Sequence, residues 1–293
     1  MRILVLGGDG MLGHRLFLTL KEHHDVRATL KRAESTYGAL GLFNPHNSFF
    51  GIDLRRTAEV ERIVEKFQPD AIINAAGIVK QREDAADPII SIQVNSLLPH
   101  QLCNLASNRG ARLIHVSTDC VFSGRVGNYS EDTAPDPVDT YGRTKLLGEI
   151  TDRPNCLTLR TSIVGRELAG RRGLLEWFLA ADCPIPGFAG SIFSGLTTHE
   201  LSRVIEMLLV QHPDLSGLYH VSSDPIDKLS LLMLFRDALR PDCDVVADTS
   251  VSIDRSLDHR RFYEATGYRP SAWPDMVAEL RIPEAQQTRV EGK

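Results

Sequence analysis

Short apolar runs alternate, along the first 165 residues, with segments in which apolar side chains recur every three or four positions. The runs are predicted strands at residues 2–6, 24–30, 71–74, 113–117 and 157–161. The periodic segments are predicted helices near 12–20, 60–67, 89–107 and 140–152, the third with a kink at Pro99. Strands that alternate with helices predict an α/β protein with a doubly wound parallel sheet, the Rossmann architecture.

The regular alternation ends after residue 165. Residues 166–198 mix glycine, arginine and aromatic residues around one apolar helix, and 224–282 have the pattern of a small α/β segment. We expect these two stretches to form a substrate-binding region, because loops on a rigid scaffold commonly carry function. Residues 1–165, joined by a returning helix and strand at 199–223, form the predicted nucleotide-binding domain, and 283–293 a flexible polar tail.

The composition excludes several classes of protein. The 293 residues are 42% hydrophobic and 24% charged, as in ordinary globular proteins. A formal net charge of −5 gives no electrostatic reason to expect binding to nucleic acid or to an anionic membrane. No apolar run approaches the roughly 18 residues of a membrane span, and the first predicted strand leaves no room for a signal peptide. We therefore expect a cytoplasmic protein.

The five cysteines are scattered and contain no C-x-x-C pair. This spacing argues against a zinc site and against a disulfide framework, and no metal site is predicted. Cys103, Cys156, Cys183 and Cys243 are interpreted as small buried hydrophobic residues, whereas Cys120 belongs to a motif described below.

The first strand leads directly into the glycine-rich segment GGDGMLG at residues 7–13. Either Gly7, Gly10 and Gly13, or Gly8 with the last two, match a dinucleotide-binding fingerprint. An ordinary tight turn is the alternative, but the strand before and the helix after favour a site for a pyrophosphate at a helix N-terminus. The predicted cofactor contacts from this segment are Gly7, Gly10, Met11, Leu12 and Gly13.

The second predicted strand ends in Lys31-Arg32, about twenty residues past the glycines. An acidic residue at this place binds the 2′-hydroxyl of the adenosine ribose, whereas a basic one accommodates a 2′-phosphate. Arg15 can add a second charge to the same phosphate. The sequence therefore predicts NADP as the cofactor, with NADPH preferred over NADH; the alternative is a pair of solvated loop charges.

Three further places are predicted to contact the cofactor. Asp53, followed by Leu54, can meet an adenine amino group, or it can serve as a turn or N-cap carboxylate. The small residues Ala75, Ala76 and Gly77 follow a strand at the edge where a parallel sheet places its ligand. Asn95 is expected to hold a water molecule or a backbone carbonyl near the active site.

Tyr141 and Lys145 are four residues apart on a predicted helix and so share one face. A tyrosine needs its anion stabilised by roughly 4 kcal/mol to titrate near pH 7. One ammonium about 4 Å away, at an effective dielectric constant of about 20, supplies a term of that size. Thr118, at the end of an earlier strand, can donate a second hydrogen bond to a carbonyl being reduced. A surface helix pair is the alternative for Tyr141 and Lys145.

Taken together in this order, the motifs resemble the extended short-chain dehydrogenase/reductase family, and within it the dTDP-4-dehydrorhamnose reductase group. The stretches are GGDGMLG, NAAG at 74–77, STDCVF at 117–122, YGRTKLLGE at 141–149 and LRTSIVG at 159–165, and the resemblance spans residues 1 to about 280. It implies that Tyr141 is the proton donor, that Lys145 stabilises it and anchors the nicotinamide ribose, and that Thr118 orients the carbonyl. Ser117 would contact the cofactor, and Asp119 and Cys120 the substrate. Lys80, Arg166 and Trp177 are further candidate substrate contacts, the alternative being ordinary surface or core residues.

The resemblance implies NADPH-dependent reduction of a nucleotide-linked 4-keto-6-deoxy sugar, in the synthesis of sugars for bacterial-type surface polysaccharides. A nucleotide-sugar epimerase or epimerase–reductase is one alternative, and a non-catalytic NADP-binding regulatory subunit is another. The chain departs from the reductase group at Ile163 and Cys120, where an aromatic residue and a tyrosine are usual. Helices near 89–107 and 140–152 could pair in a homodimer.

Cys120 bears on what happens to the sugar beyond reduction. Nucleotide-sugar dehydratases carry glutamate at the matching position, so dehydration is not expected. GDP-fucose synthases are similar in having a cysteine there, but they add a histidine where this chain has Glu167. We therefore expect reduction without epimerisation.

Overall fold

The computed structural model describes residues 1–79 and 87–281, and the contacts between residues divide the chain into two compact units. The first unit contains Met1–Ser117, Asp139–Leu159 and Ser202–Leu218. The second contains, of the described residues, Thr118–Val138, Arg160–Leu201 and residues 219–281. Segments 118–138, 160–165, 199–201 and 219–223 thus fall in the second unit, whereas the sequence pattern grouped them with the nucleotide-binding part. The predicted tail at 283–293 lies outside the described residues.

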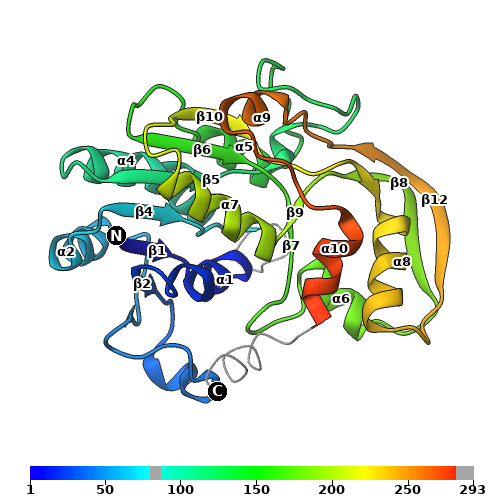
Figure 1. Cartoon of the computed structure of the whole chain (residues 1–293), viewed down its shortest axis with the longest axis horizontal. Coiled ribbons are helices and arrows are strands. Elements are labelled where there is room, and N and C mark those ends of the chain that lie inside the picture. Colours follow the sequence, from blue (N-terminus) through cyan, green and yellow to red (C-terminus); the bar gives the residue numbers. More distant parts are fainter. Residues whose placement is uncertain (80–86, 282–293) are drawn as a thin grey trace. The chain divides into compact units, whose positions relative to one another are not determined.

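A seven-stranded sheet in the order β10-β6-β5-β4-β1-β2-β3 organises the first unit (Figure 1). Its strands are β1 (Arg2–Leu6), β2 (Asp25–Thr29), β3 (Ser48–Phe49), β4 (Ala71–Asn74), β5 (Arg112–Val116), β6 (Cys156–Arg160) and β10 (Gly217–His220). Strands β1 to β6 pair in parallel, and the strand order reverses between β1 and β4. The predicted doubly wound α/β fold is confirmed. Strand β3 was not predicted, because a strand of two residues carries no periodicity.

Helices cover both faces of this sheet. They are α1 (Met11–Leu20), α2 (Thr57–Phe67), α3 (Pro88–Ser91), α4 (Leu98–Ser107), α5 (Thr140–Leu147) and α7 (Thr198–Val210), with single 3₁₀ turns η1 (Glu34–Thr36) and η2 (Gly38–Leu40). Leu4 and Leu6 of β1 pack in one apolar core with residues of α2 and α4. Ile3 and Val5 alternate with them and are buried on the other face, where α1 and α7 lie (Figure 1). Of the described residues, no helix has the length and apolar character needed to cross a membrane.

The helix predicted at 89–107 is interrupted by a π-helical turn. α3 begins after Asp87, whose carboxylate accepts a hydrogen bond from the backbone N–H of Ile89 at 2.8 Å. The π-helical turn η4 (Ile92–Leu97) then precedes α4. Pro99 has no N–H with which to bond the carbonyl of Asn95 four residues earlier. That carbonyl instead faces Gly148, where any side chain would collide with it. The irregularity predicted at Pro99 therefore lies in the turn that precedes it.

The second unit contains two small sheets. The sheet β11-β8-β12 packs against α8, and β7 pairs with β9. The strands are β7 (Ile163–Val164), β8 (Ile185–Phe193), β9 (Leu196–Thr197), β11 (Ile226–Asp227) and β12 (Val245–Asp254). The helices are α6 (Leu174–Ala180), α8 (Lys228–Leu239), α9 (Arg260–Thr266) and α10 (Trp273–Ala278), with 3₁₀ turns η5 (Asp119–Val121) and η6 (Glu279–Arg281).

A disulfide joins Cys183 and Cys243 in the second unit. The expectation that both are unpaired buried residues is wrong. β8 and β12 are parallel and pair Ile185 with Val245, so the cysteines two residues before each strand come together. This proximity depends on a strand register that the cysteine spacing does not reveal. Cys103 and Cys156 are buried thiols in the first unit, as expected, with their sulfur atoms 2.7 Å apart.

Candidate active site

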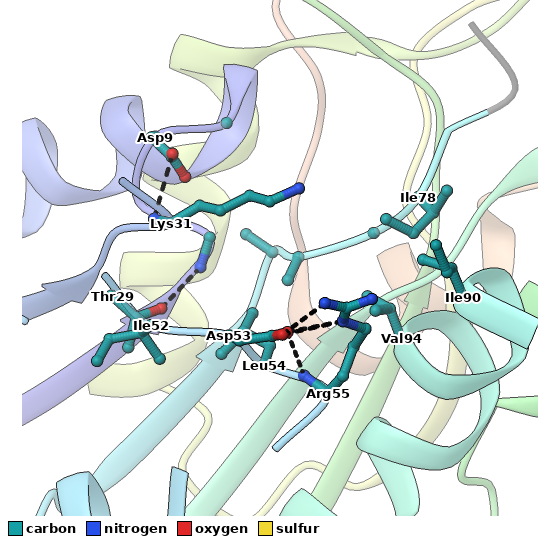
Figure 2. Close-up of a pocket in the computed structure, with 15 residues that line it drawn as sticks. Asp9, Thr29, Lys31, Ile52, Asp53, Leu54, Arg55, Ile78, Ile90 and Val94 are labelled. Carbon is teal, nitrogen blue, oxygen red and sulfur yellow. Dashed lines mark hydrogen bonds and ion pairs between the residues drawn. The ribbon is translucent and has the colours of Figure 1, made fainter. Parts of the chain in front are cut away.

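A pocket of the first unit lies where β1, β2 and β4 end, at the point where the strand order reverses (Figure 2). Parallel sheets bind their ligands at this switch point. The lining residues come from the glycine turn, the ends of β2 and β4, the segment before α2 and the region of α3 and η4. They are Gly7, Asp9, Gly10, Thr29, Lys31, Ile52, Asp53, Leu54, Arg55, Ala75, Ala76, Gly77, Ile78, Ile90 and Val94. Eight of the residues predicted from the sequence are thus brought together in one pocket.

The glycine turn leaves backbone exposed at the start of α1. Gly7 adopts φ +77°, which favours glycine, and its N–H donates to the hydroxyl of Thr29 at 3.2 Å. A side chain at Gly13 would collide with the Gly7 carbonyl, so only glycine allows α1 to start this close to the turn. Gly10 is the N-cap of α1 and provides no side-chain cap. The N–H groups of the first helical turn are therefore available to an anion.

Met11, Leu12 and Gly13 form that first turn of α1, but their side chains do not line the pocket. Leu12 is buried in the core. Any contact that these residues make with a cofactor would come from their backbone N–H groups.

Of the three predicted basic residues, only Lys31 lines the pocket, with its side chain extended along it (Figure 2). Arg15 donates from Nε to the hydroxyl of Thr19 at 3.2 Å, one turn further along α1. Arg32 is exposed, and its backbone N–H donates to the Tyr37 hydroxyl oxygen at 3.2 Å.

A carboxylate that was not predicted from the sequence, Asp9, also lines the pocket. Its Oδ2 accepts hydrogen bonds from the Tyr37 hydroxyl at 2.6 Å and from the backbone N–H of Lys31 at 3.4 Å. Burial and the hydrogen bond to Asp9 raise the pKa of Tyr37 to about 12. The Tyr37 hydroxyl therefore keeps its proton at neutral pH and donates it to Asp9 in a hydrogen bond.

Asp53 lines the pocket together with a cation that was not predicted either. Its carboxylate accepts hydrogen bonds from the Arg55 guanidinium, the shortest at 2.6 Å, and from the backbone N–H of Arg55 at 3.1 Å (Figure 2). The Arg55 hydrogen bonds hold the pKa of Asp53 below its usual value. Asp53 is thus both a turn carboxylate and a pocket residue, and Leu54 and Arg55 line the pocket beside it.

Asn95 does not line the pocket, but it is hydrogen-bonded to Ile78, which does. It lies in the π-helical turn η4 and is fully buried. Its amide accepts from the backbone N–H of Ile78 at 2.8 Å and donates to the Ile78 carbonyl at 3.0 Å and to the Thr144 hydroxyl at 3.1 Å. Asn95 thereby ties Ile78, in the loop that follows β4, to α5, the helix that carries Tyr141 and Lys145.

Helix α5 presents Tyr141 and Lys145 on one face. It begins after Asp139, whose carboxylate accepts from the Gly142 N–H at 2.7 Å. Tyr141 is half-buried, whereas Lys145 is 3% exposed and donates from Nζ to the Val116 carbonyl at 2.7 Å. Burial lowers the pKa of Lys145 to about 8, and the negative charge of Glu149 opposes this shift. The lysine therefore remains mostly protonated at neutral pH.

Ser117, predicted to contact the cofactor, donates from its hydroxyl to Glu149 at 2.7 Å. It follows β5, whose last residue, Val116, provides the carbonyl that binds Lys145. Ser117, Glu149 and Lys145 thus form one cluster of the first unit, and none of them lines the pocket described above.

The remaining predicted residues are in the second unit or outside the described residues. The Thr118 hydroxyl donates to Asp119 and accepts from the Cys120 N–H, both at 3.1 Å.

The other predicted substrate contacts lie near α6. Arg166 pairs with Glu176 at 3.5 Å, and Trp177 is exposed on α6. Glu167 accepts hydrogen bonds from the backbone N–H groups of Arg172 and Gly173.

Lys80 lies outside the described residues. Within residues 1–79 and 87–281, no group of three or more histidine, cysteine, aspartate or glutamate side chains could hold a metal ion.

The fold, the switch-point pocket and helix α5 define the class as extended short-chain dehydrogenases/reductases, which are NAD(P)-dependent oxidoreductases. The chain belongs to the family described as RmlD substrate binding domain, which matches residues 1–175. It is 26% identical to the dTDP-4-dehydrorhamnose reductase of Aggregatibacter actinomycetemcomitans, over 96% of this chain and 98% of that one. It is 29% identical to the probable low-salt glycan biosynthesis reductase Agl14 of Haloferax volcanii, over 76% and 75% of the two chains.

A solved structure shares the fold. The dTDP-4-dehydrorhamnose reductase of Bacillus anthracis, in complex with NADP, superposes with a TM-score of 0.77 at 20% identity, over 95% of this chain and 96% of that chain. The match of the family model to residues 1–175 confirms, at the level of the family, the resemblance inferred from the motifs.

Proposed function

We propose that this protein reduces the keto group of a nucleotide-linked 4-keto-6-deoxy sugar with NADPH. The observation that carries the proposal is the buried Lys145, held by the Val116 carbonyl one helical turn from Tyr141. A buried lysine is costly, because desolvation disfavours its charge. We attribute the buried charge of Lys145, beside the half-buried Tyr141, to a role in the reduction of the substrate.

The pocket fits a nicotinamide dinucleotide. The start of α1 and the turn at Gly7 would bind the pyrophosphate, because no side chain caps the N–H groups of the first helical turn and glycine at position 13 lets the helix start close to the turn. Lys31 would meet the adenosine ribose, and Asp53 with Leu54 the adenine. The dinucleotide, when bound, supplies the hydride.

Tyr141 would donate a proton to the carbonyl oxygen of the sugar. Stabilising the tyrosine anion by roughly 4 kcal/mol moves its pKa from about 10 to near 7, and one nearby ammonium provides a term of that order. Lys145 would provide that charge, since its pKa of about 8 keeps it mostly protonated at neutral pH. Thr118 would orient the carbonyl; its hydroxyl, which donates to Asp119 in this structure, would turn to the substrate.

Lys31 supports NADPH as the preferred cofactor, since its side chain is the cation that reaches the pocket from the end of β2. A 2′-phosphate carries a charge of about −1.5 to −2 at pH 7. Arg32 and Arg15 would contribute only through longer-range attraction.

In the second unit, Asp119, Cys120, Arg166 and Trp177 are the proposed substrate contacts. Glu167 stands where the epimerase–reductases are expected to have a histidine, and its carboxylate accepts hydrogen bonds from the backbone of its own loop. We therefore infer reduction without epimerisation. Deuterium incorporated from D₂O next to the ketone, and lost in Cys120→Ser, would show an epimerase–reductase instead.

A homodimer through α3, η4 and α5 is also proposed. Ile89 and Leu147 are each 65% exposed and Leu97 is 49% exposed, which is unusual for apolar side chains on neighbouring helices. Sedimentation of the wild type and of Leu147→Glu would distinguish a dimer from a monomer.

The names of the relatives support a place in glycan synthesis, and we propose that the protein works in the cytoplasm.

The test of the function is NADPH oxidation followed spectrophotometrically with a panel of nucleotide-linked keto sugars. A non-catalytic regulatory subunit would bind NADPH without oxidising it on any sugar of the panel. Turnover with a 4-keto-6-deoxy sugar, and none with its 4-hydroxy product, is the result expected.

A further inference from the structure

A carboxylate is held in the pocket at the place where the cofactor's adenosine ribose is expected. Asp9 lies between Gly8 and Gly10, is half-buried, and lines the pocket with Lys31. Its Oδ2 accepts from the Tyr37 hydroxyl at 2.6 Å and from the Lys31 backbone N–H at 3.4 Å (Figure 2 draws the second bond). The carboxylate is therefore fixed by two partners from other parts of the chain.

Tyr37 is itself held rigidly. Its side chain is 6% exposed, and its ring packs edge-on against Phe43 with centroids 5.9 Å apart and beside Phe50 at 6.2 Å. The hydroxyl also accepts from the backbone N–H of Arg32 at 3.2 Å. A tyrosine fixed in this way positions the Asp9 carboxylate at the edge of the pocket.

In dinucleotide folds, the residue at the end of the second strand decides between two cofactors. A carboxylate at the end of the second strand accepts a hydrogen bond from the ribose 2′-hydroxyl and repels a 2′-phosphate, whereas a cation attracts the phosphate. In this chain β2 ends without an acid. Asp9 reaches the Lys31 N–H from the neighbouring glycine turn, and so brings a carboxylate to the same position as the lysine.

We propose that Asp9 is a specificity-determining residue that binds the ribose 2′-hydroxyl and restrains the preference for NADPH set by Lys31, with Tyr37 as its positioning residue. This inference rests on the proposed use of a nicotinamide dinucleotide. At comparable distances the two side chains act on a 2′-phosphate with opposite signs. Removing the Asp9 charge should therefore raise the affinity for NADPH relative to that for NADH, and removing the Lys31 charge should lower it.

The experiment measures the dissociation constants of NADH and NADPH for the full chain by calorimetry. Asp9→Asn keeps the shape and removes the charge, and we expect it to bind NADPH about 10-fold more tightly and NADH several-fold more weakly. Lys31→Gln should weaken NADPH about 10-fold and change NADH little. Asp25→Asn, an exposed carboxylate at the other end of β2, is the matched control and should leave the ratio unchanged.

The outcomes separate the two proposals. If the wild type binds neither dinucleotide, the proposed function fails, and this inference with it. If the wild type binds both and Asp9→Asn leaves the ratio of the constants as it was, the role of Asp9 is refuted while the function stands. A general disturbance of the glycine turn would weaken both dinucleotides equally and would also overturn the inference. Asp9→Ser and Tyr37→Phe provide the same comparison if Asp9→Asn does not fold, with a loss of NADH affinity expected for both.

Discussion

Replacing Lys145 by methionine should stabilise the protein while abolishing turnover. Burial lowers the pKa of this lysine from 10.5 to about 8, and this difference corresponds to about 3 kcal/mol against the charged form. Methionine has a similar unbranched shape and no charge to desolvate. It loses the hydrogen bond from the charged ammonium to the Val116 carbonyl, which costs about 2 kcal/mol. The net expectation is a gain of about 1 kcal/mol in the free energy of unfolding at pH 7.

The dependence on pH gives this prediction a second readout. Since the folded-state pKa lies below that of the unfolded chain, the unfolded state binds more protons between about pH 8 and 10.5. The wild type should therefore gain stability relative to Lys145→Met as the pH rises through this window. Below pH 8 the full difference between the two proteins should be present.

Urea unfolding followed by far-UV circular dichroism measures both effects. Lys66→Met, at an exposed position in the last turn of α2, is the matched control and should change stability by less than about 0.5 kcal/mol. A Lys145→Met protein that is less stable than the wild type at pH 7 would refute the reasoning. A difference that stays constant from pH 8 to 10.5 would refute it as well.

Two further changes test the local structure. Gly13→Ala places a methyl group against the Gly7 carbonyl, and it should weaken dinucleotide binding at least 10-fold and lower the free energy of unfolding by about 1–3 kcal/mol. Gly38→Ala, at an open position, is the control and should change neither quantity. Equal dinucleotide affinity in both variants would contradict the close packing at Gly13. Replacing both Cys183 and Cys243 by serine removes the cross-link that closes a loop spanning 60 residues, and it should destabilise the second unit by up to about 4 kcal/mol. Thermal unfolding under non-reducing conditions measures this effect, and an unchanged Tm would argue against the disulfide.

Local patterns were sufficient to predict the elements that position the chemistry. The glycine turn was found because Gly7, Gly10 and Gly13 stand between an apolar strand and a periodic helix. The spacing of Tyr141 and Lys145 predicted that both lie on one face of a helix, and α5 carries them both. These signals are contained in a few consecutive residues, so the sequence carries them directly.

Features that depend on tertiary proximity could not be predicted in this way. Asp9 is an ordinary turn residue in the sequence, and its hydrogen bonds with Tyr37 and Lys31 form only when the fold brings these residues to it. Arg55 gains its place beside Asp53 from the turn before α2. The pairing of Cys183 with Cys243 needs the parallel register of β8 and β12.

The most direct test of the central claim compares the wild type with Tyr141→Phe, using NADPH and a nucleotide-linked 4-keto-6-deoxy sugar. The change removes the proposed proton donor and no pocket-lining group. We expect kcat to fall at least 100-fold while the dissociation constant of NADPH stays within about a factor of two. Turnover by Tyr141→Phe close to that of the wild type, with the same NADPH affinity, would contradict the assignment of Tyr141 and the mechanism built on it.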